Sequence, residues 1–303
     1  MTKRLLYPFD IAILSYVGLL TILIFIFGRP INLYYKPLLT NLLVALIVLA
    51  IIFLLKDIGR RPVLFFRILY PGLLFTVFYE QTGGLMRLFF PDFLDRQLVS
   101  FETSIFGIEP SLWLDANLIN VWITEILSFC YFSYYLMLPV FLLGFFFLKK
   151  YDEIKKGLTA ICVTFFISFL LFFLYPIEGP RYFFAGQYSH NITGPIFRPL
   201  VDFAIESGAV HGGCMPSSHV AVALIILIFT MRNFPKAGWY LIPINMGLAL
   251  GTVYGRFHYA SDVVVGAVIG TTATILTLRY YDKLAGAAEK PLIDQTETAK
   301  YVS

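Results

Sequence analysis

The chain has 303 residues, of which 58% are hydrophobic and only 14% are charged. Since charged residues make up about a quarter of a soluble domain, and the mean hydropathy is +0.77, the composition excludes an ordinary soluble protein and predicts that most of the chain lies in lipid. The formal net charge of +4 is spread among the predicted loops and indicates no nucleic-acid partner.

Long apolar runs predict an all-α, polytopic transmembrane helical bundle of about eight spans. A helix needs about 20 apolar residues to cross the hydrocarbon core, and most runs have that length. The third run contains Arg67 and the pair Pro71-Gly72, so it predicts either a kinked span or a re-entrant segment. In chain order the runs are 10–27, 38–55, 62–80, 122–148, 157–176, 216–231, 238–255 and 260–279.

The basic residues predict the orientation, because Lys and Arg concentrate in cytoplasmic loops. With eight spans, most of them flank the inner ends, although the outer loops are longer in total. Omitting the third span would move the four lysines of 149–156 to the outside. We therefore expect a multi-pass protein of a bacterial inner membrane or a eukaryotic endomembrane, with both termini in the cytoplasm.

The segments between and after the apolar runs predict short helices, a loop and a tail. Residues 81–121 mix charged and apolar residues and predict short helices lying in the outer interface, whereas 177–215 is rich in Gly, Pro and aromatic residues and predicts an ordered loop. No polar linker separates two cores, so residues 1–283 are predicted to form one membrane-embedded domain with its core at about 122–280. The polar, aperiodic residues 284–303 predict a disordered cytoplasmic tail.

All four histidines fall on the outer side in this topology, and the first cluster surrounds His219. Residues 216–219 read Pro-Ser-Ser-His and precede an apolar run. Proline suits the first turn of a helix, so His219 is expected at the start of the sixth span, where free N–H groups favour an anion. The apolar stretch 220–231 is only about 18 Å long as a helix, which predicts a sunken pocket. The alternative is a histidine bonded to a loop carbonyl at the cap.

A second cluster opens the eighth span. His258 and Asp262 are four residues apart and would share a helix face. A carboxylate beside an imidazole fixes its tautomer and makes one ring nitrogen more basic. In the alternative interpretation, Asp262 caps the helix and His258 is an interfacial residue. Gly266 and Gly270 continue the spacing and predict close packing against a neighbouring helix.

Two arginines lie near these clusters. Arg181 follows the fifth span and could fork onto phosphate oxygens, and Arg256 precedes the second cluster directly. The alternative for Arg181 is to snorkel to headgroups or to pair with Glu178. Together the clusters bring two histidines, an aspartate and two arginines to one outer depth, which indicates a functional site.

These residues resemble the type 2 phosphatidic acid phosphatase superfamily of membrane lipid phosphatases and phosphotransferases. Residues 216–219 resemble its second motif, Pro-Ser-Gly-His, with serine in place of glycine, and 258–262 resemble the third, in which histidine precedes aspartate by four. The lysine of the first motif is missing, and Thr252 stands where the third motif has arginine. These departures, and residues 106–113, resemble the branch of inositol phosphorylceramide synthases and their bacterial relatives. The resemblance covers about 90–280.

The resemblance implies that His258 is the phosphorylated nucleophile, that Asp262 orients it, and that His219 protonates the leaving group. It implies a double displacement, without a metal or cofactor, that moves the phosphoryl group of a membrane lipid phosphate to water or to a hydroxyl of a polyol or lipid. The residues expected to bind the substrate are Arg181, Arg256, Ser217 and Ser218.

The branch resemblance favours transfer of a phosphosphingolipid or phospholipid headgroup, and hydrolysis of a polyprenyl diphosphate or phosphatidate is the alternative. A zinc site would use His190, His211, His219 and His258, but their spacing matches no metal signature. A non-enzymatic lipid or anion transporter, with arginines along its path, is a third class. It leaves the spacing of His258 and Asp262 unexplained.

Overall fold

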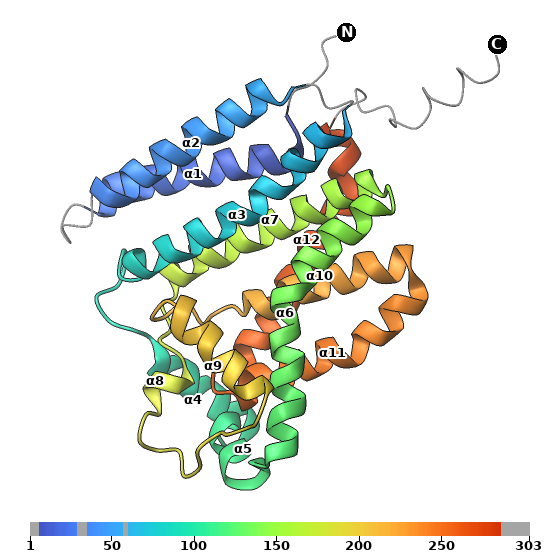
Figure 1. Cartoon of the computed structure of the whole chain (residues 1–303). Helices are drawn as coiled ribbons and strands as arrows, with labels where there is room; N and C mark the ends of the chain where they lie inside the picture. Colours follow the sequence, from blue (N-terminus) through green and yellow to red (C-terminus); the bar gives the residue numbers. More distant parts are fainter. Residues whose placement is uncertain (1–5, 29–34, 57–59, 286–303) are drawn as a thin grey trace, which may run out of the picture.

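The computed structural model describes residues 6–28, 35–56 and 60–285. Within these ranges the chain forms twelve helices and no strand, which confirms the all-α prediction (Figure 1). The helices are α1 (Pro8–Phe27), α2 (Tyr35–Leu54), α3 (Arg61–Leu85), α4 (Asp95–Phe106), α5 (Pro110–Leu118), α6 (Val121–Phe147), α7 (Tyr151–Leu174), α8 (Pro180–Phe183), α9 (Phe197–Gly208), α10 (Ser218–Asn233), α11 (Pro235–Tyr254) and α12 (Ala260–Ala285).

Each of the eight predicted runs corresponds to one long helix. Six of these helices, α1, α2, α3, α6, α7 and α12, are long and apolar enough to cross a membrane. Helix α10 is apolar but has only 16 residues, and α11 is not among the six. A membrane protein with several spans is therefore supported, whereas the count of eight stays a prediction. Helix α12 continues to Ala285, and most of the predicted tail, 286–303, lies outside the described residues.

Helix α7 is the centre of the bundle. It packs against α1 and α3 on one side and against α10 and α12 on the other, so the first three helices and the last three lie on opposite sides of it (Figure 1). Within its most apolar window, 72% of the residues are buried, more than in any other candidate span. Its Phe169 and Phe173 are fully inaccessible.

The third run forms a continuous helix of 25 residues, with Pro71 inside it. This length favours a span over a re-entrant segment. Arg67 is completely buried, and its Nη2 lies 2.5 Å from Oδ2 of Asp10 in α1. The Tyr70 hydroxyl donates a hydrogen bond to the other oxygen of Asp10. A buried charge requires such a partner, which explains how an arginine fits within an apolar run.

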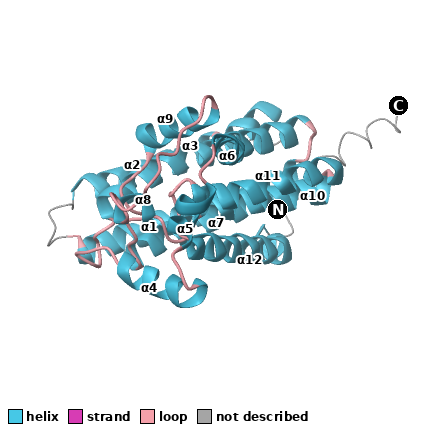
Figure 2. Ribbon diagram, turned by 90° about the horizontal axis from the view of Figure 1, so that it is seen from below, coloured by secondary structure: helices cyan, strands magenta, loops and turns pink. Residues whose placement is uncertain are grey.

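The four short helices, α4, α5, α8 and α9, gather at one end of the long ones (Figure 1), and Figure 2 looks onto this end. Helices α4 and α5 fall in the segment predicted to be short helices, and their position at a membrane interface stays a prediction. The segment 177–215, predicted as a loop, contains α8 and α9 instead. Three N–H groups at the start of α9 donate to the distant Glu125 carboxylate, a stabilising contact that local sequence does not reveal.

Helices α10 and α12 approach each other closely at two glycines, as their spacing predicts. A Cβ atom at Gly266 would overlap the backbone oxygen of Ser217, and one at Gly270 would overlap that of Ala221. The Ser217 N–H also donates to the Asp262 carbonyl, at 2.9 Å. This contact brings the start of α10 next to the start of α12.

Candidate active site

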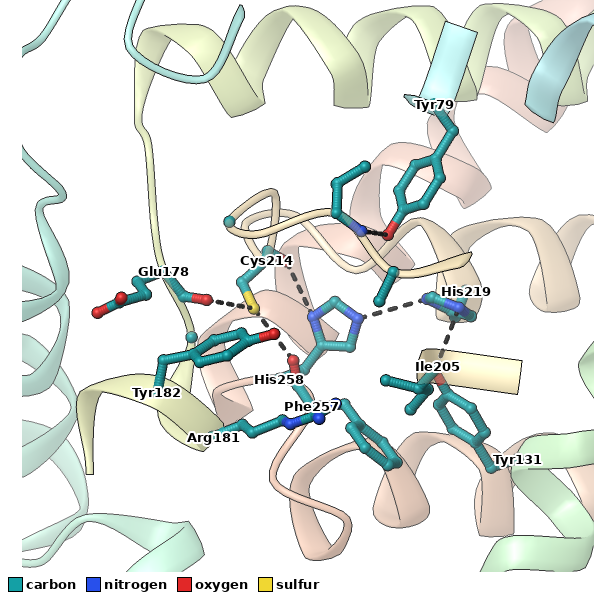
Figure 3. A pocket seen from close by; sticks show the side chains of 14 residues that line it. Tyr79, Tyr131, Glu178, Arg181, Tyr182, Ile205, Cys214, His219, Phe257 and His258 are labelled. Atoms are coloured by element: carbon teal, nitrogen blue, oxygen red, sulfur yellow. Dashed lines mark hydrogen bonds between the residues drawn. The ribbon is translucent and has the colours of Figure 1, made fainter. Parts of the chain in front are cut away.

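Two histidines from distant parts of the chain meet where α10 and α12 begin (Figure 3). His219 lies in the first turn of α10, and His258 lies in the turn between α11 and α12. Nε2 of His258 is 3.4 Å from Nδ1 of His219. The close approach of the two helices at Gly266 therefore places the two imidazoles within hydrogen-bond distance.

The other ring nitrogen of His258 faces acceptors. Its Nδ1 is 2.9 Å from the Cys214 carbonyl oxygen and 3.3 Å from Oδ2 of Asp262. Asp262 is fully buried and also accepts the Tyr259 N–H at 2.9 Å. Burial lowers the pKa of His258 to about 4, and the bond to the Cys214 carbonyl opposes part of that shift. His258 is therefore a neutral imidazole at neutral pH, with its proton on Nδ1.

Cys214 binds the backbone next to His258 through its side chain. Its thiol donates to the Phe257 carbonyl at 3.0 Å, and burial raises the pKa of this thiol well above its usual range. Gly179 lies against the same sulfur, where a Cβ atom would overlap Sγ, and its φ of +103° suits only glycine. Three loops therefore converge at this thiol, which stays protonated and acts as a small packing group.

His219 is enclosed by aromatic rings of α6. The Tyr131 hydroxyl is 3.3 Å from Nε2 of His219, and the two rings stack at 5.3 Å with an interplanar angle of 30°. The Tyr134 ring lies at 4.5 Å on another side. Both ring nitrogens of His219 thus have a partner, Tyr131 on one side and His258 on the other.

A cavity of about 70 Å³ opens beside the two imidazoles, and we refer to it as the histidine cavity. Figure 3 shows Arg181, Glu178 and Tyr182 around it. Arg181 is exposed and, among the described residues, forms no ion pair. Glu178 instead accepts a bond from His211, at 2.7 Å. The histidine cavity therefore has one guanidinium without an ion pair at its edge, and anion binding by Arg181 stays a prediction.

Arg256 does not line the histidine cavity, and this differs from the prediction that it holds a phosphate. Its Nη2 donates to Oδ1 of Asp115 at 2.6 Å and to the His190 carbonyl at 2.5 Å. Its guanidinium lies 3.8 Å from the centre of the Tyr188 ring. Arg256 has a positive φ of 65°, which turns its side chain toward α5 and away from the neighbouring His258. In this geometry Arg256 stabilises the loop that contains His190 by linking it to α5.

The two serines of the Pro-Ser-Ser-His segment have different surroundings. Ser217 is the N-cap of α10, its hydroxyl accepts the Val220 N–H, and it is fully buried. Ser218 lines a second cavity on the far side of His219. Neither serine borders the histidine cavity, so Ser217 supports the helix start on which His219 depends.

Sequence reasoning missed four buried acids in 81–121. Asp95 accepts N–H groups of Glu178 and Gly179 and the Tyr259 hydroxyl, all at 2.8–2.9 Å. Glu102 accepts the N–H and the hydroxyl of Ser261 at the start of α12. Glu109, the N-cap of α5, accepts the Ser111 hydroxyl, and Asp115 within α5 accepts the Arg256 guanidinium. The seven-residue spacing of Asp95 and Glu102, which places them on one face of α4, was the available signal.

The four histidines do not form the zinc set considered from the sequence. His190 is paired with Asp115, and His211 with Glu178. Among the described residues, the one group of three potential metal ligands is Cys214, His258 and Asp262, whose ligand atoms lie within 4.8 Å of one another. It includes a single histidine, and Nδ1 of that histidine already faces the Cys214 carbonyl.

The chain is similar in sequence to known proteins. A family model described as the PAP2 superfamily matches residues 96–276. A PA-phosphatase related-family protein of Dictyostelium discoideum is 25% identical over 133 residues, which is 43% of this chain. The match spans only 23% of the length of that relative. No solved structure matches the chain.

Proposed function

Since the chain belongs to the PAP2 superfamily, we propose that it is a membrane enzyme that transfers the phosphoryl group of a lipid phosphate through a phosphohistidine. The observation that carries this proposal is the 3.4 Å contact between His258 and His219, with Asp262 behind His258. A transporter has no need for a buried neutral imidazole aligned with a second imidazole at the edge of a cavity.

The direction of the hydrogen bonds supports His258 as the nucleophile. The Cys214 carbonyl can only accept, so Nδ1 of His258 carries the hydrogen and Nε2 has a free lone pair. That lone pair faces His219 and the histidine cavity. Asp262 lies against Nδ1 and stabilises the positive charge that develops on the ring when Nε2 bonds to phosphorus.

His219 is proposed to move the proton. A bound phosphate anion favours the imidazolium form of His219, whose Nδ1–H passes to the leaving oxygen as the P–O bond breaks. The neutral Nδ1 then takes the proton of water or of an acceptor hydroxyl, which attacks the phosphohistidine. The Tyr131 hydroxyl can accept from Nε2–H or donate to bare Nε2, so it holds His219 in both states. Arg181 offsets the charge on the equatorial oxygens.

This scheme requires a change of geometry when substrate binds. A phosphorus bonded to Nε2 of His258, with its leaving oxygen facing Nδ1 of His219, needs more than the 3.4 Å between the two nitrogens. The His258 ring is fixed by the Cys214 carbonyl, whereas His219 borders open space of about 420 Å³ on its far side. We therefore expect His219 to be the ring that moves.

The finer assignments are part of the proposal. The site lies at the end of α7 opposite to the lysines of 149–156, and those lysines favour a cytoplasmic position, so we place the site on the outer or lumenal side. The departures in the third motif favour headgroup transfer to a lipid or polyol hydroxyl. Hydrolysis of phosphatidate or a polyprenyl diphosphate uses the same groups with water as acceptor.

A turnover panel tests the proposal. Purified protein in detergent is given phosphatidate, a polyprenyl diphosphate, or ceramide together with a phosphoinositide, and both free phosphate and the transferred headgroup are measured. The His258→Ala variant serves as the blank. We expect turnover of at least one donor by the wild type and none by the variant. Equal product from both proteins would reject the proposal.

A further inference from the structure

A larger cavity of about 420 Å³ adjoins the histidine cavity on the far side of His219. Helices α3 and α6 form its walls, and α9 covers it. The two cavities share Tyr79, Tyr131 and His219 as lining residues. We name this larger cavity the tyrosine slot. Since His219 lies in the wall of both cavities, the movement of this ring that the proposed function requires would let one molecule occupy both.

The tyrosine slot changes in character along its length. On α3 its lining runs from Tyr79 to Gly72, and on α6 it runs from Tyr131 to Pro139. Seven positions on α3 and eight on α6 correspond to about 10–12 Å. Tyr79 and Tyr131 therefore lie at the end that includes His219, and the residues at the far end, Gly72, Leu138 and Pro139, have no polar side chain.

The slot is open at its side. Thr76 on α3 is exposed, and so are Tyr135 and Pro139 on α6, although all three line the slot. These positions belong to helices that are long and apolar enough to cross a membrane, so the opening faces lipid. A chain can enter from the bilayer without passing through water.

Two hydroxyls stand at this opening. Thr76 and Tyr135 each lie about one helical turn, roughly 5 Å, farther along the slot than Tyr79 and Tyr131. The Tyr131 and Tyr135 side chains share a hydrogen bond, and when Tyr131 is its donor the hydrogen of Tyr135 is left for another acceptor. In lipid a donor without an acceptor is costly, so a ligand in the slot gains by offering an acceptor to Thr76 and Tyr135 at this depth. Ester and amide carbonyls lie a few bonds from the phosphorus in glycerolipid and sphingolipid phosphates, whereas a polyprenyl phosphate has no acceptor there.

We infer that the tyrosine slot binds the segment between the phosphate and the hydrocarbon, and that the hydroxyls of Thr76 and Tyr135 select donors with a carbonyl in that segment. This inference rests on the proposed function and narrows its substrate to an ester- or amide-linked lipid phosphate. The far end of the slot, at Gly72 and Leu138, takes the first carbons of the chain.

The test compares four donors that differ in this segment: ester-linked phosphatidate, ceramide phosphate, the dialkyl ether analogue of phosphatidate, and farnesyl phosphate. The wild type should favour one of the two carbonyl donors over both carbonyl-free donors by about fivefold or more in kcat/KM, the effect of an ordinary hydrogen bond. The first two donors distinguish ester from amide recognition.

The variant Thr76→Val with Tyr135→Phe removes both hydroxyls and keeps the shapes. Its ratio of kcat/KM between carbonyl and carbonyl-free donors should fall close to one, and this ratio does not depend on the folded fraction of the sample. Tyr240→Phe, which removes a hydroxyl from an exposed position of α11 outside the slot, should keep the wild-type ratio.

Three results would overturn the inference. A wild type without carbonyl preference excludes it, and so does a preference that survives in the double variant; in both cases the proposed function stands. A wild type that turns over no lipid phosphate at all rejects the proposed function and, with it, the inference.

Discussion

Nε2 of His258 lies 3.4 Å from Nδ1 of His219, although 39 positions separate these residues in the chain. The approach depends on glycine at 266, where α12 touches the backbone of Ser217. Ser217 in turn caps the helix that carries His219. The geometry of the imidazole pair therefore depends on how closely two helices pack.

The Tyr131 hydroxyl should matter for proton transfer. Replacing Tyr131 by Phe keeps the ring that stacks on His219 and removes the hydrogen bond to Nε2. Loss of one hydrogen bond, about 1 kcal/mol, should lower kcat for a lipid donor about five- to tenfold with little change in KM. A p-nitrophenyl donor has a leaving group that needs no proton, so its kcat should change little. An equal loss with both donors would indicate a purely structural role.

The pH dependence should reflect the low pKa of His258. Burial lowers this pKa to about 4, while the groups that face the ring are His219, Asp262 and the Cys214 carbonyl. Neutral His258 therefore persists at pH values well below 6.5, the value of a free histidine. The acid limb of kcat/KM that belongs to nucleophile protonation should lie below 6.5. An NMR titration of the His258 ring in the free enzyme with a midpoint at or above 6.5 would contradict this.

The pH dependence of the free energy of unfolding should also reflect the low pKa of His258. Between about 4 and 6.5 the unfolded chain binds a proton on His258 that the folded chain does not, so the free energy of unfolding falls as the pH drops through this window. Thermal unfolding of the wild type and of His258→Gln in detergent measures this effect. The stability of the wild type relative to the variant should decrease from pH 7 toward the lower end of the window. If the stability of the wild type relative to His258→Gln rises as the pH falls, the prediction is wrong.

Asp95 should support the site without contacting the substrate. In Asp95→Asn one carboxylate oxygen becomes an amide nitrogen, which cannot accept the N–H groups of Glu178 or Gly179. A buried donor without an acceptor costs about 1–3 kcal/mol, so the melting temperature should fall together with activity. Asp92→Asn, at an exposed position nearby, is the matched control and should change neither. An Asp95→Asn protein with wild-type stability would contradict the bracing role.

Chelation should leave the activity unchanged. Arg181 is the positive group available at the histidine cavity, and Nδ1 of His258 and the Cys214 thiol already have carbonyl partners. We therefore expect equal rates before and after treatment with EDTA and dialysis. A loss of activity that added zinc restores would contradict this expectation and favour a metal at Cys214, His258 and Asp262.

The apolar runs and the spacing of His258 and Asp262 were sufficient to predict most helices and the central groups of the candidate site. Hydrophobic length and helical periodicity are local properties, and they determine where a span begins and which residues share its face. The predicted packing role of Gly266 follows from the same periodicity. For these features, no knowledge of distant contacts was required.

The features that sequence reasoning missed depend on distant contacts. Asp95 and Glu102 resemble the polar face of an interfacial helix, yet they are buried because their partners, among them Tyr259 and Ser261, follow about 160 positions later. Arg256 precedes the nucleophile candidate in the chain, but a positive φ directs it to Asp115. The seven-residue spacing of Asp95 and Glu102 indicates a shared helix face, but it does not identify their distant partners, and the backbone conformation at Arg256 leaves no pattern in a single sequence.

Trapping of the phosphorylated enzyme tests the central claim most directly. Protein incubated with a donor labelled on the transferred phosphate is quenched, denatured and digested, and the label is located by mass spectrometry. We predict a phosphate on His258 that is labile in acid and stable in base, reduced by about 10²–10³-fold in rate of formation in Asp262→Asn and absent in His258→Ala. Turnover of the same donor with label on another residue, or with undiminished labelling of His258→Ala, would contradict the account.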